Sequence, residues 1–359
     1  MVEARHGPLA GVRIVELDAP GAIPFACMLL ADMGCDVVRI PRPGGDERIA
    51  QPLYRGRTVI ELDLSRVAER EQALALIAQA DGVVEGFRPG VAEELGLDPA
   101  RCLALNPRLA YGRASGWGRE GPLAGTTGND INHLALSGAL HAIGPAATPV
   151  PPLNLLGEYA AGALYLALGM VAAILSAQAT GRGQVVEAAQ TDGLASLMTL
   201  YYALHEGGRW TDARATNMID GGAPFYRCYA CADGRHVAVG AIEPQAFHAL
   251  CEGLGIDPRR YNPYHRSRWA ALTTVLSEAF ATRTRDEWAA IFAAGTACVT
   301  PVMSLTEAPL HPHNRARGTF VESGGAAQPA PAPRFSATPA KAGDEGLFET
   351  VEQVLGRWG

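Results

Sequence analysis

The sequence predicts an α/β fold in which a parallel sheet is followed by a smaller α+β domain. Apolar segments at residues 11–17, 36–40 and 82–87 have the length and composition of buried strands, and helical patterns at residues 25–33 and 67–80 separate them. Strands that alternate with helices in this way indicate a parallel sheet, because parallel neighbours need a crossover connection. We expect this sheet to organise the first half of the chain.

Further segments extend the same pattern. Residues 59–64, 109–114 and 184–189 are predicted strands, and residues 193–205 are a predicted helix. Beyond them, residues 225–232 and 236–241 flank the pair Asp233-Gly234, which is a strong hairpin signal. Helical patterns follow at residues 245–254, 268–281 and 286–294. A hairpin with helices predicts the second, smaller α+β domain.

Composition shifts suggest the domain boundaries. We expect a large domain over residues 1–206 and a polar, Gly-rich linker over residues 207–224. The small α+β domain then covers residues 225–320. Residues 321–359 form a Pro/Ala-rich returning linker and a C-terminal helix, which packs on the large domain.

Charge and composition exclude several classes of function. The chain has 359 residues, a net charge of −7 and a pI near 5.7, which argues against a nucleic-acid binder. Lys341 is the only lysine, so lysine-nucleophile chemistry is disfavoured. The N-terminal segment MVEARHGPLAG lacks the apolar core of a signal peptide, and the seven cysteines are scattered. We expect a cytoplasmic protein.

A long uncharged run at residues 159–179 has the length of a membrane span. It is rich in Ala and Gly, and it directly follows the carboxylate of Glu158. A central helix of a soluble core fits these features better, so no membrane partner is expected.

The most informative stretch joins two predicted helix starts. In residues 128–144 the apolar positions have helical spacing, and Asn129 and Asp130 stand at the N-cap. Glu158 opens a second helix that extends to about residue 179, and it carries the only charge of that helix. A helix N-terminus favours an anion or an enolate oxygen, and partial burial would raise the basicity of a carboxylate. Simple helix capping explains Asp130 and Glu158 equally well.

Two further residues are weaker candidates. His133 lies four residues after Asn129, on the same helix face, although a single histidine in an apolar helix is usually a core residue. Glu243 follows the second hairpin strand and could either reach into a cleft or remain solvated.

Several familiar motifs are missing or incomplete. The turn after the first strand, DAPGAIP, is not the G-x-G-x-x-G of a dinucleotide site. Cys228 and Cys231 form a single C-x-x-C pair on a predicted strand, where residues three apart face opposite sides, so a metal site is not expected. Cys298 could be a nucleophile, but a buried structural cysteine is commoner.

Loops at strand ends are the expected ligand contacts. Arg39 and Arg42 lie near the carboxyl end of the second strand, where open α/β sheets bind ligands. The loop that contains Gly116, Trp117 and Gly118 allows a ligand to approach the backbone closely.

Matches along almost the whole chain resemble one family. They are GPLAGVRIVEL, DVVRIPRPGG, VVEGFRPGV, ASGWGREGP, NDIN with LSGALHAIG, PPLNLLGEY, GRGQVVEAAQTDG, NMIDGGAPFY, ADGRHVAVGAIEPQ and ACVTPV. These segments resemble the type III CoA-transferase superfamily, and within it the bacterial α-methylacyl-CoA racemases.

The resemblance implies a fold, a partner and a ligand. It implies a large Rossmann-like domain, a small α+β domain, and an interlocked homodimer whose active site lies between the large domain of one chain and the small domain of the other. Coenzyme A would be held by Arg42, Arg88 and the loop of Gly116, Trp117 and Gly118. The substrate would be an acyl-CoA or an acyl-carrier thioester, with no tightly bound cofactor.

The chain departs from the family at the catalytic positions. The racemases have a histidine where this chain has Asn129, and an aspartate where it has Glu158. An amide cannot accept a proton at neutral pH, but it can donate a hydrogen bond to a thioester or enolate oxygen. The resemblance therefore implies enolate chemistry with Glu158 as the principal base, and two-base racemisation requires a second proton carrier, for which His133 and Glu243 are candidates.

Two alternatives remain open. Type III CoA-transferases use the equivalent carboxylate as a nucleophile, and Glu158 could do the same. A non-catalytic acyl-CoA-binding homologue is also consistent with the two replacements.

Overall fold

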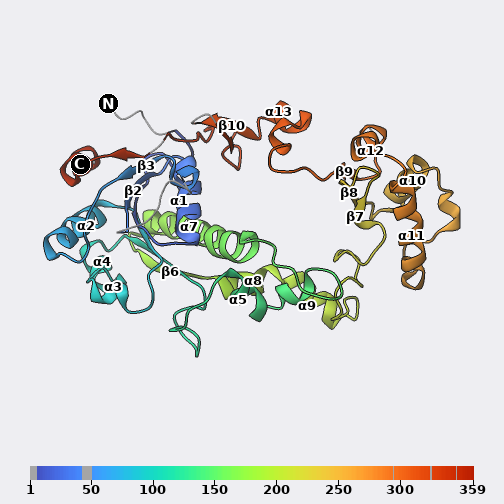
Figure 1. Cartoon of the computed structure of the whole chain (residues 1–359). Helices are drawn as coiled ribbons and strands as arrows, with labels where there is room; N and C mark the ends of the chain where they lie inside the picture. The colour runs from blue at the N-terminus through green and yellow to red at the C-terminus, as the bar shows by residue number, and fades with distance from the viewer. Residues whose placement is uncertain (1–5, 43–50, 294, 324–325, 345) are drawn as a thin grey trace. The chain divides into compact units, whose positions relative to one another are not determined.

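The computed structural model describes residues 6–42, 51–293, 295–323, 326–344 and 346–359 (Figure 1). The chain forms two compact units. Unit 1 comprises Met1–Ser137, Leu153–Leu197 and Arg315–Gly359, and unit 2 comprises Gly138–Pro152 and Met198–Asn314. The chain thus leaves unit 1 and returns to it near its C-terminus. The expected boundaries at 206, 224 and 320 stay predictions.

A parallel sheet forms the centre of unit 1. Its strands are β1 (Arg13–Leu17), β2 (Asp36–Ile40), β3 (Arg57–Val59), β4 (Gly82–Glu85), β5 (Ala110–Ser115), β6 (Gln184–Ala189) and β12 (Leu347–Phe348). They are ordered β12-β3-β2-β1-β4-β5-β6, and every pair is parallel. This order reverses between β1 and β4, which is the point where α/β sheets place their ligands.

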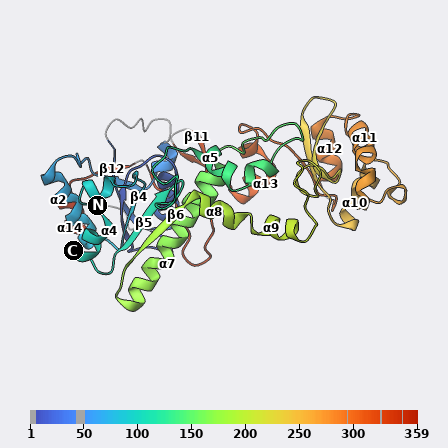
Figure 2. The same cartoon turned by 90° about the horizontal axis from the view of Figure 1, so that it is seen from below.

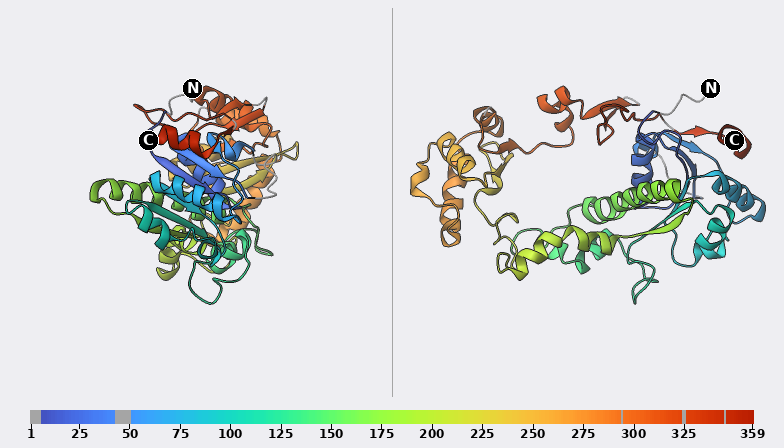
Figure 3. Two further views of the ribbon diagram at one scale, coloured as in Figure 1. Left: turned by 90° about the vertical axis from the view of Figure 1, so that its left-hand side faces the viewer. Right: turned by 180° about the vertical axis from the view of Figure 1, so that it is seen from behind.

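Helices cover both faces of this sheet (Figures 2 and 3). On one face, α1 (Ala22–Asp32) and α7 (Tyr165–Thr180) pack in one apolar cluster with strand residues such as Val37. The other face is covered by α2 (Val67–Gln79), α4 (Pro99–Leu105) and α14 (Val351–Trp358), which pack with residues such as Val38. Adjacent strand residues therefore serve opposite faces, as the two-residue period of a strand requires.

The segments near the expected site differ from a simple helix pattern. One helix was expected from Asn129 onward, but α5 (Asp130–Leu136) ends before Gly138, whose φ of 81° breaks the helix, and α6 (Ala139–Ala142) follows. The helix expected from Glu158 begins as a π-helical segment, Leu155–Leu164, and continues as α7. In this segment the backbone N–H of Tyr159 donates to the Asn154 carbonyl, five residues earlier. Such π segments are often found at functional sites.

Other boundaries also shift. The prediction of a strand over residues 59–64 is wrong, because β3 ends at Val59. The helix expected at residues 193–205 is two helices, α8 (Gln190–Leu197) and α9 (Thr199–Glu206). Four short elements complete the α-helices and β-strands described outside unit 2's core. They are α3 (Val91–Glu94), α13 (Pro312–Arg317), β10 (Phe320–Ser323) and β11 (Ala326–Pro329).

Unit 2 contains the predicted hairpin. β7 (Tyr226–Ala230) and β8 (His236–Gly240) are antiparallel, and β9 (Val299–Pro301), which was not predicted, adds to β8. The three expected helices are confirmed as α10 (Pro244–Gly253), α11 (Trp269–Phe280) and α12 (Arg285–Phe292). Their core contains Phe225, Phe247, Leu276 and Phe280. Unit 2 therefore has an apolar core of its own.

The long apolar helix packs in the core of unit 1. Leu155–Thr180 is long and apolar enough to cross a membrane by length and composition, and 50% of its most apolar window is buried. Leu166 and Met170 are fully buried against the sheet. Leu168 and Leu175 on its other side are 69% and 66% exposed. The helix thus has one face in the core and one apolar face that unit 1 leaves uncovered.

Candidate active site

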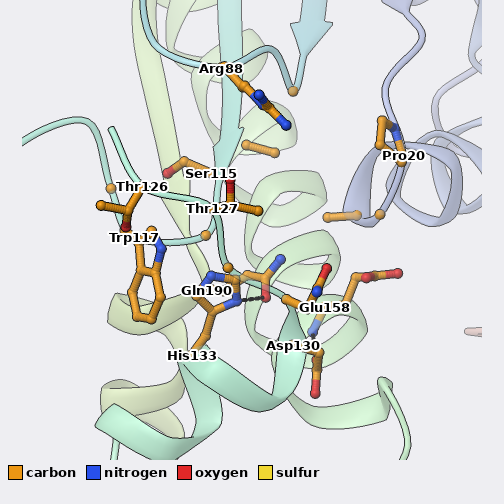
Figure 4. Close-up of a pocket in the computed structure, with 18 of the residues that line it drawn as sticks. Pro20, Arg88, Ser115, Trp117, Thr126, Thr127, Asp130, His133, Glu158 and Gln190 are labelled. Atoms are coloured by element: carbon orange, nitrogen blue, oxygen red, sulfur yellow. Dashed lines mark hydrogen bonds between the residues drawn. The ribbon is translucent and has the colours of Figure 1, made fainter. Parts of the chain in front are cut away.

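A cavity of about 340 Å³ lies at the carboxyl ends of the central strands of unit 1 (Figure 4). The turn after β1, the loops after β4 and β5, the start of α5 and the π-helical segment all contribute to its wall. The wall includes five of the candidates from the sequence together with the Gly-rich loop: Arg88, Gly116, Trp117, Gly118, Asn129, Asp130, His133 and Glu158. The cavity therefore lies where the strand order reverses.

Glu158 projects from the first turn of the π-helical segment. Asn154 Nδ2 donates to Glu158 Oε1 at 3.0 Å, and a Cβ placed on Gly21 would lie 3.6 Å from Glu158 Oε2. Burial raises the pKa of Glu158, the negative charge of Asp130 raises it further, and the hydrogen bond from Asn154 lowers it. Within the described part of the chain Glu158 has no ion-pair partner. Its carboxylate is half-buried at the cavity, and a neutral amide is its side-chain hydrogen-bond partner.

Asp130 links the start of α5 to the start of the π-helical segment by a hydrogen bond. Its Oδ1 accepts a hydrogen bond from the backbone N–H of Glu158 at 2.5 Å. Gly157 makes this approach possible, because a Cβ at that position would lie 2.4 Å from Asp130 Oδ1. Burial raises the pKa of Asp130, while the N–H groups of Glu158 and Gly157 and the charge of His133 lower it. Asp130, at the start of α5, therefore caps the N-terminus of the neighbouring π-helical segment, and its Oδ1 accepts a hydrogen bond there.

Asn129 is the N-cap of α5 and its side chain is exposed. Asn132 Oδ1 accepts from the backbone N–H of Asn129 at 3.0 Å, which fixes the backbone at this position. Since Asn129 and Glu158 line the same cavity, an amide donor and a carboxylate are presented to one ligand.

His133 lines the cavity but is almost fully buried. Its side chain is 2% exposed, and Nδ1 bonds to Gln190 Oε1 at 2.8 Å, which requires the proton on Nδ1. Burial lowers the pKa of His133, while the hydrogen bond with Gln190 and the charge of Asp130 raise it. Nε2 has no hydrogen-bond partner among the described residues, and Gly116 and the Trp117 ring cover it. As a proton carrier, which stays a prediction, His133 would first have to be uncovered.

The expected ligand-binding residues divide into two groups. Arg88, Gly116, Trp117 and Gly118 line the cavity, and Arg88 is exposed (Figure 4). Arg42 is exposed but is not part of the cavity wall.

Arg39 is no ligand clamp in this structure. Its guanidinium is 1% exposed and donates to Asp18 Oδ2 at 2.8 Å.

The other candidates lie in unit 2. Glu243 is the exposed N-cap of α10. Cys228 is exposed and Cys231 is buried, in agreement with opposite faces. Cys298 is exposed, contrary to the commoner buried state. Among the described residues no group of three or more His, Cys, Asp or Glu side chains could hold a metal ion.

Besides the link from Asp130 to Glu158, two contacts at the candidate site were not predicted. Asn154 stands four residues before Glu158, a spacing that brings side chains together on a helix, so the sequence held a usable signal. Gln190 reaches His133 across 57 positions of sequence, and no local pattern could have identified it.

The fold and cavity define an open α/β protein with a ligand site at the switch point of its sheet. The chain belongs to CoA-transferase family III, whose profile matches residues 9–345. It is 41% identical to the α-methylacyl-CoA racemase of Mus musculus over 359 residues, covering 98% of this chain and 93% of the mouse protein. It is 28% identical to the acetyl-CoA:oxalate CoA-transferase of Acetobacter aceti over 348 residues, which covers 90% of this chain and 88% of that protein.

Solved structures show the same fold. A CAIB/BAIF family protein from Brucella suis superposes with a TM-score of 0.84 at 23% identity, covering 99% of this chain and 100% of that chain. The prediction of an α/β chain of this family is confirmed.

Proposed function

We propose that this protein is a racemase-like acyl-CoA enzyme that removes the α-proton of an acyl thioester with Glu158. The observation that carries the proposal is that Glu158 and Asn129 line one cavity from two helix starts, which Asp130 joins. The similarity to an α-methylacyl-CoA racemase supports a thioester with an acidic α-carbon. The carrier of the acyl group is proposed to be coenzyme A, with Arg88 beside the entrance.

The chemistry follows from the two side chains. The Cα–H bond breaks, the proton passes to the Glu158 carboxylate, and the electron pair moves into the thioester carbonyl to form an enolate. The raised pKa of Glu158 makes it a stronger base than an exposed glutamate. The amide N–H of Asn129 can donate to the enolate oxygen, where charge develops. Return of a proton from Glu158 to the same face completes exchange, whereas epimerisation requires a second proton carrier on the opposite face, for which His133 and Glu243 are the candidates.

A heavy-water experiment tests this proposal. 2-Methylacyl-CoA is incubated with the enzyme in D₂O, and deuterium at the α-carbon is measured by mass spectrometry. Uptake by the wild-type protein supports the proposal. No uptake from any thioester would contradict it, and retained CoA binding would then identify a non-catalytic acyl-CoA-binding homologue.

Coenzyme A transfer is the second candidate. It is favoured by the same accessible carboxylate and by the similarity to an acetyl-CoA:oxalate CoA-transferase. In that reaction Glu158 attacks the thioester carbonyl, CoA leaves as the thiolate, and an acyl anhydride forms on the enzyme. Hydroxylamine added during turnover would convert the anhydride to a Glu158 hydroxamate, which peptide mass spectrometry detects. Proton exchange forms no such adduct.

A second copy of the chain is the proposed partner. Leu164, Leu168 and Leu175 are 47%, 69% and 66% exposed on one apolar helix, an arrangement typical of interaction surfaces. Analytical ultracentrifugation should give a dimer. L168R combined with L175R should dissociate it, and a wild-type monomer would contradict this assembly.

A further inference from the structure

Unit 2 contains a second pocket, of about 590 Å³, which the proposed reaction does not use. Arg227 on β7, Arg266 before α11 and Trp269 in its first turn line this pocket, together with threonines of the 211–216 loop. No carboxylate is among its described lining residues. Its size suits a small organic ligand.

The two arginines of this pocket have no acidic partner. Within the described part of the chain neither forms an ion pair, and Arg227 Nε is buried without a hydrogen-bond acceptor. Among the described residues Arg266 donates a hydrogen bond to the Arg209 carbonyl alone, at 3.2 Å, and its guanidinium lies 5.5 Å from the centre of the Trp269 ring. Arg227 is half-buried and Arg266 is exposed. The buried arginines Arg55, Arg57 and Arg285, by contrast, are paired with Asp32, Glu16 and Glu307. Two unneutralised guanidinium groups at one concave site favour an anion.

Several hydrogen bonds hold the loop that supplies Thr211 and Thr216 to the pocket. Asn217 is 1% exposed and donates to the Thr211 carbonyl at 3.0 Å. Asp220 accepts from the backbone N–H groups of Asn217 and Gly222 at 2.9 and 3.0 Å. These hydrogen bonds order the loop that carries Thr211 and Thr216. The pocket is therefore preorganised before any ligand arrives.

We propose that this pocket of unit 2 binds the phosphoryl group of a small molecule through Arg227 and Arg266. Guanidinium groups match phosphate oxygens with paired N–H donors. The proposal is independent of the reaction at Glu158. Its phosphoryl group comes either from a separate metabolite or from coenzyme A itself.

Calorimetric titration of the full-length protein with inorganic pyrophosphate tests the site. The wild-type protein should bind pyrophosphate, and R227Q and R266Q should each weaken binding about tenfold, since each removes a charge-assisted contact. R268Q is the matched control: Arg268 is exposed, lies two residues from Arg266 and is outside the pocket, so its replacement should change the affinity less than about twofold at 0.15 M salt.

A second series identifies the source of the phosphoryl group. Coenzyme A and its 3′-dephospho form are titrated into the wild-type and the R227Q/R266Q protein. Weaker binding of coenzyme A alone assigns the site to its 3′-phosphate, and unchanged binding of both assigns it to a separate metabolite. Absence of pyrophosphate binding, or equal losses in R268Q and R227Q, would overturn the proposal. An unchanged thermal unfolding curve for each variant excludes misfolding as the cause.

Discussion

The carboxylates near the strand ends of unit 1 fall into two groups. Glu16 and Glu85 are fully buried and bonded to Arg57 and Arg113, at 3.0 and 2.6 Å. Glu158 borders the cavity, and its side-chain partner is a neutral amide. Burial raises the pKa of all three carboxyls, so basicity alone does not distinguish them. The difference lies in access and in the absence of a cation, and it separates a reactive carboxylate from a structural one.

The largest expected effect separates the two groups by stability. E16Q should lower the free energy of unfolding by about 3 kcal/mol, because Arg57 would keep a buried charge without its counter-ion. E158Q should leave stability the same or higher at pH 7: a raised folded-state pKa means that the ionised carboxylate costs free energy above the unfolded pKa. Urea unfolding of both variants measures this. Equal losses of unfolding free energy in E16Q and E158Q would contradict the division into structural and cavity-facing carboxylates.

A smaller effect tests how Glu158 is positioned. In G157A the new Cβ would lie 2.4 Å from Asp130 Oδ1, so the contact between the two helix starts must break. A displacement of about 1 Å at a reacting group costs roughly a hundredfold in rate. We expect such a loss in α-proton exchange with little change in CoA binding. G356A, in α14, is the control, because a Cβ at Gly356 would meet no atom within 4 Å. Full activity of G157A would show that the link is dispensable.

The pH profile gives the next test. The charge of Asp130 raises the pKa of Glu158, so D130N should move the acid limb of the exchange profile to lower pH. Since the carboxylate form is the base, activity rises as pH passes this pKa. An upward shift in D130N would contradict the assigned coupling.

Asn154 should act in the opposite direction, and more strongly than Asp130, because its hydrogen bond outweighs the charge of Asp130 in setting the pKa of Glu158. Its hydrogen bond lowers the pKa of Glu158, so N154A should move the acid limb to higher pH. Two opposite shifts from two neighbours of one carboxylate would identify Glu158 as the titrating base. Profiles that do not move in either variant would point to another group.

The strands and the residues around the cavity were predicted from the sequence better than the π-helical segment and the contact between Asp130 and Glu158. Apolar strands and the Asp233-Gly234 turn are local signals, and both elements formed as expected. The π-helical start of the long helix was missed, because the wider turn depends on packing against α1 and α8; for example, a Cβ at Gly193 would lie 2.2 Å from the Ala161 carbonyl. The link from Asp130 to Glu158 was missed for the same reason. It joins residues 28 positions apart, through a glycine whose need appears only in three dimensions.

The most direct test of the account is the rate of α-deuterium uptake by 2-methylacyl-CoA in E158Q, with E120Q as the matched control at an exposed glutamate. We expect E158Q to lose about a thousandfold in exchange while CoA binding is retained, because removal of a general base costs 10²–10⁴ in rate. E120Q should exchange at the wild-type rate. Exchange in E158Q at a rate close to the wild type would contradict the assignment of Glu158 as the base.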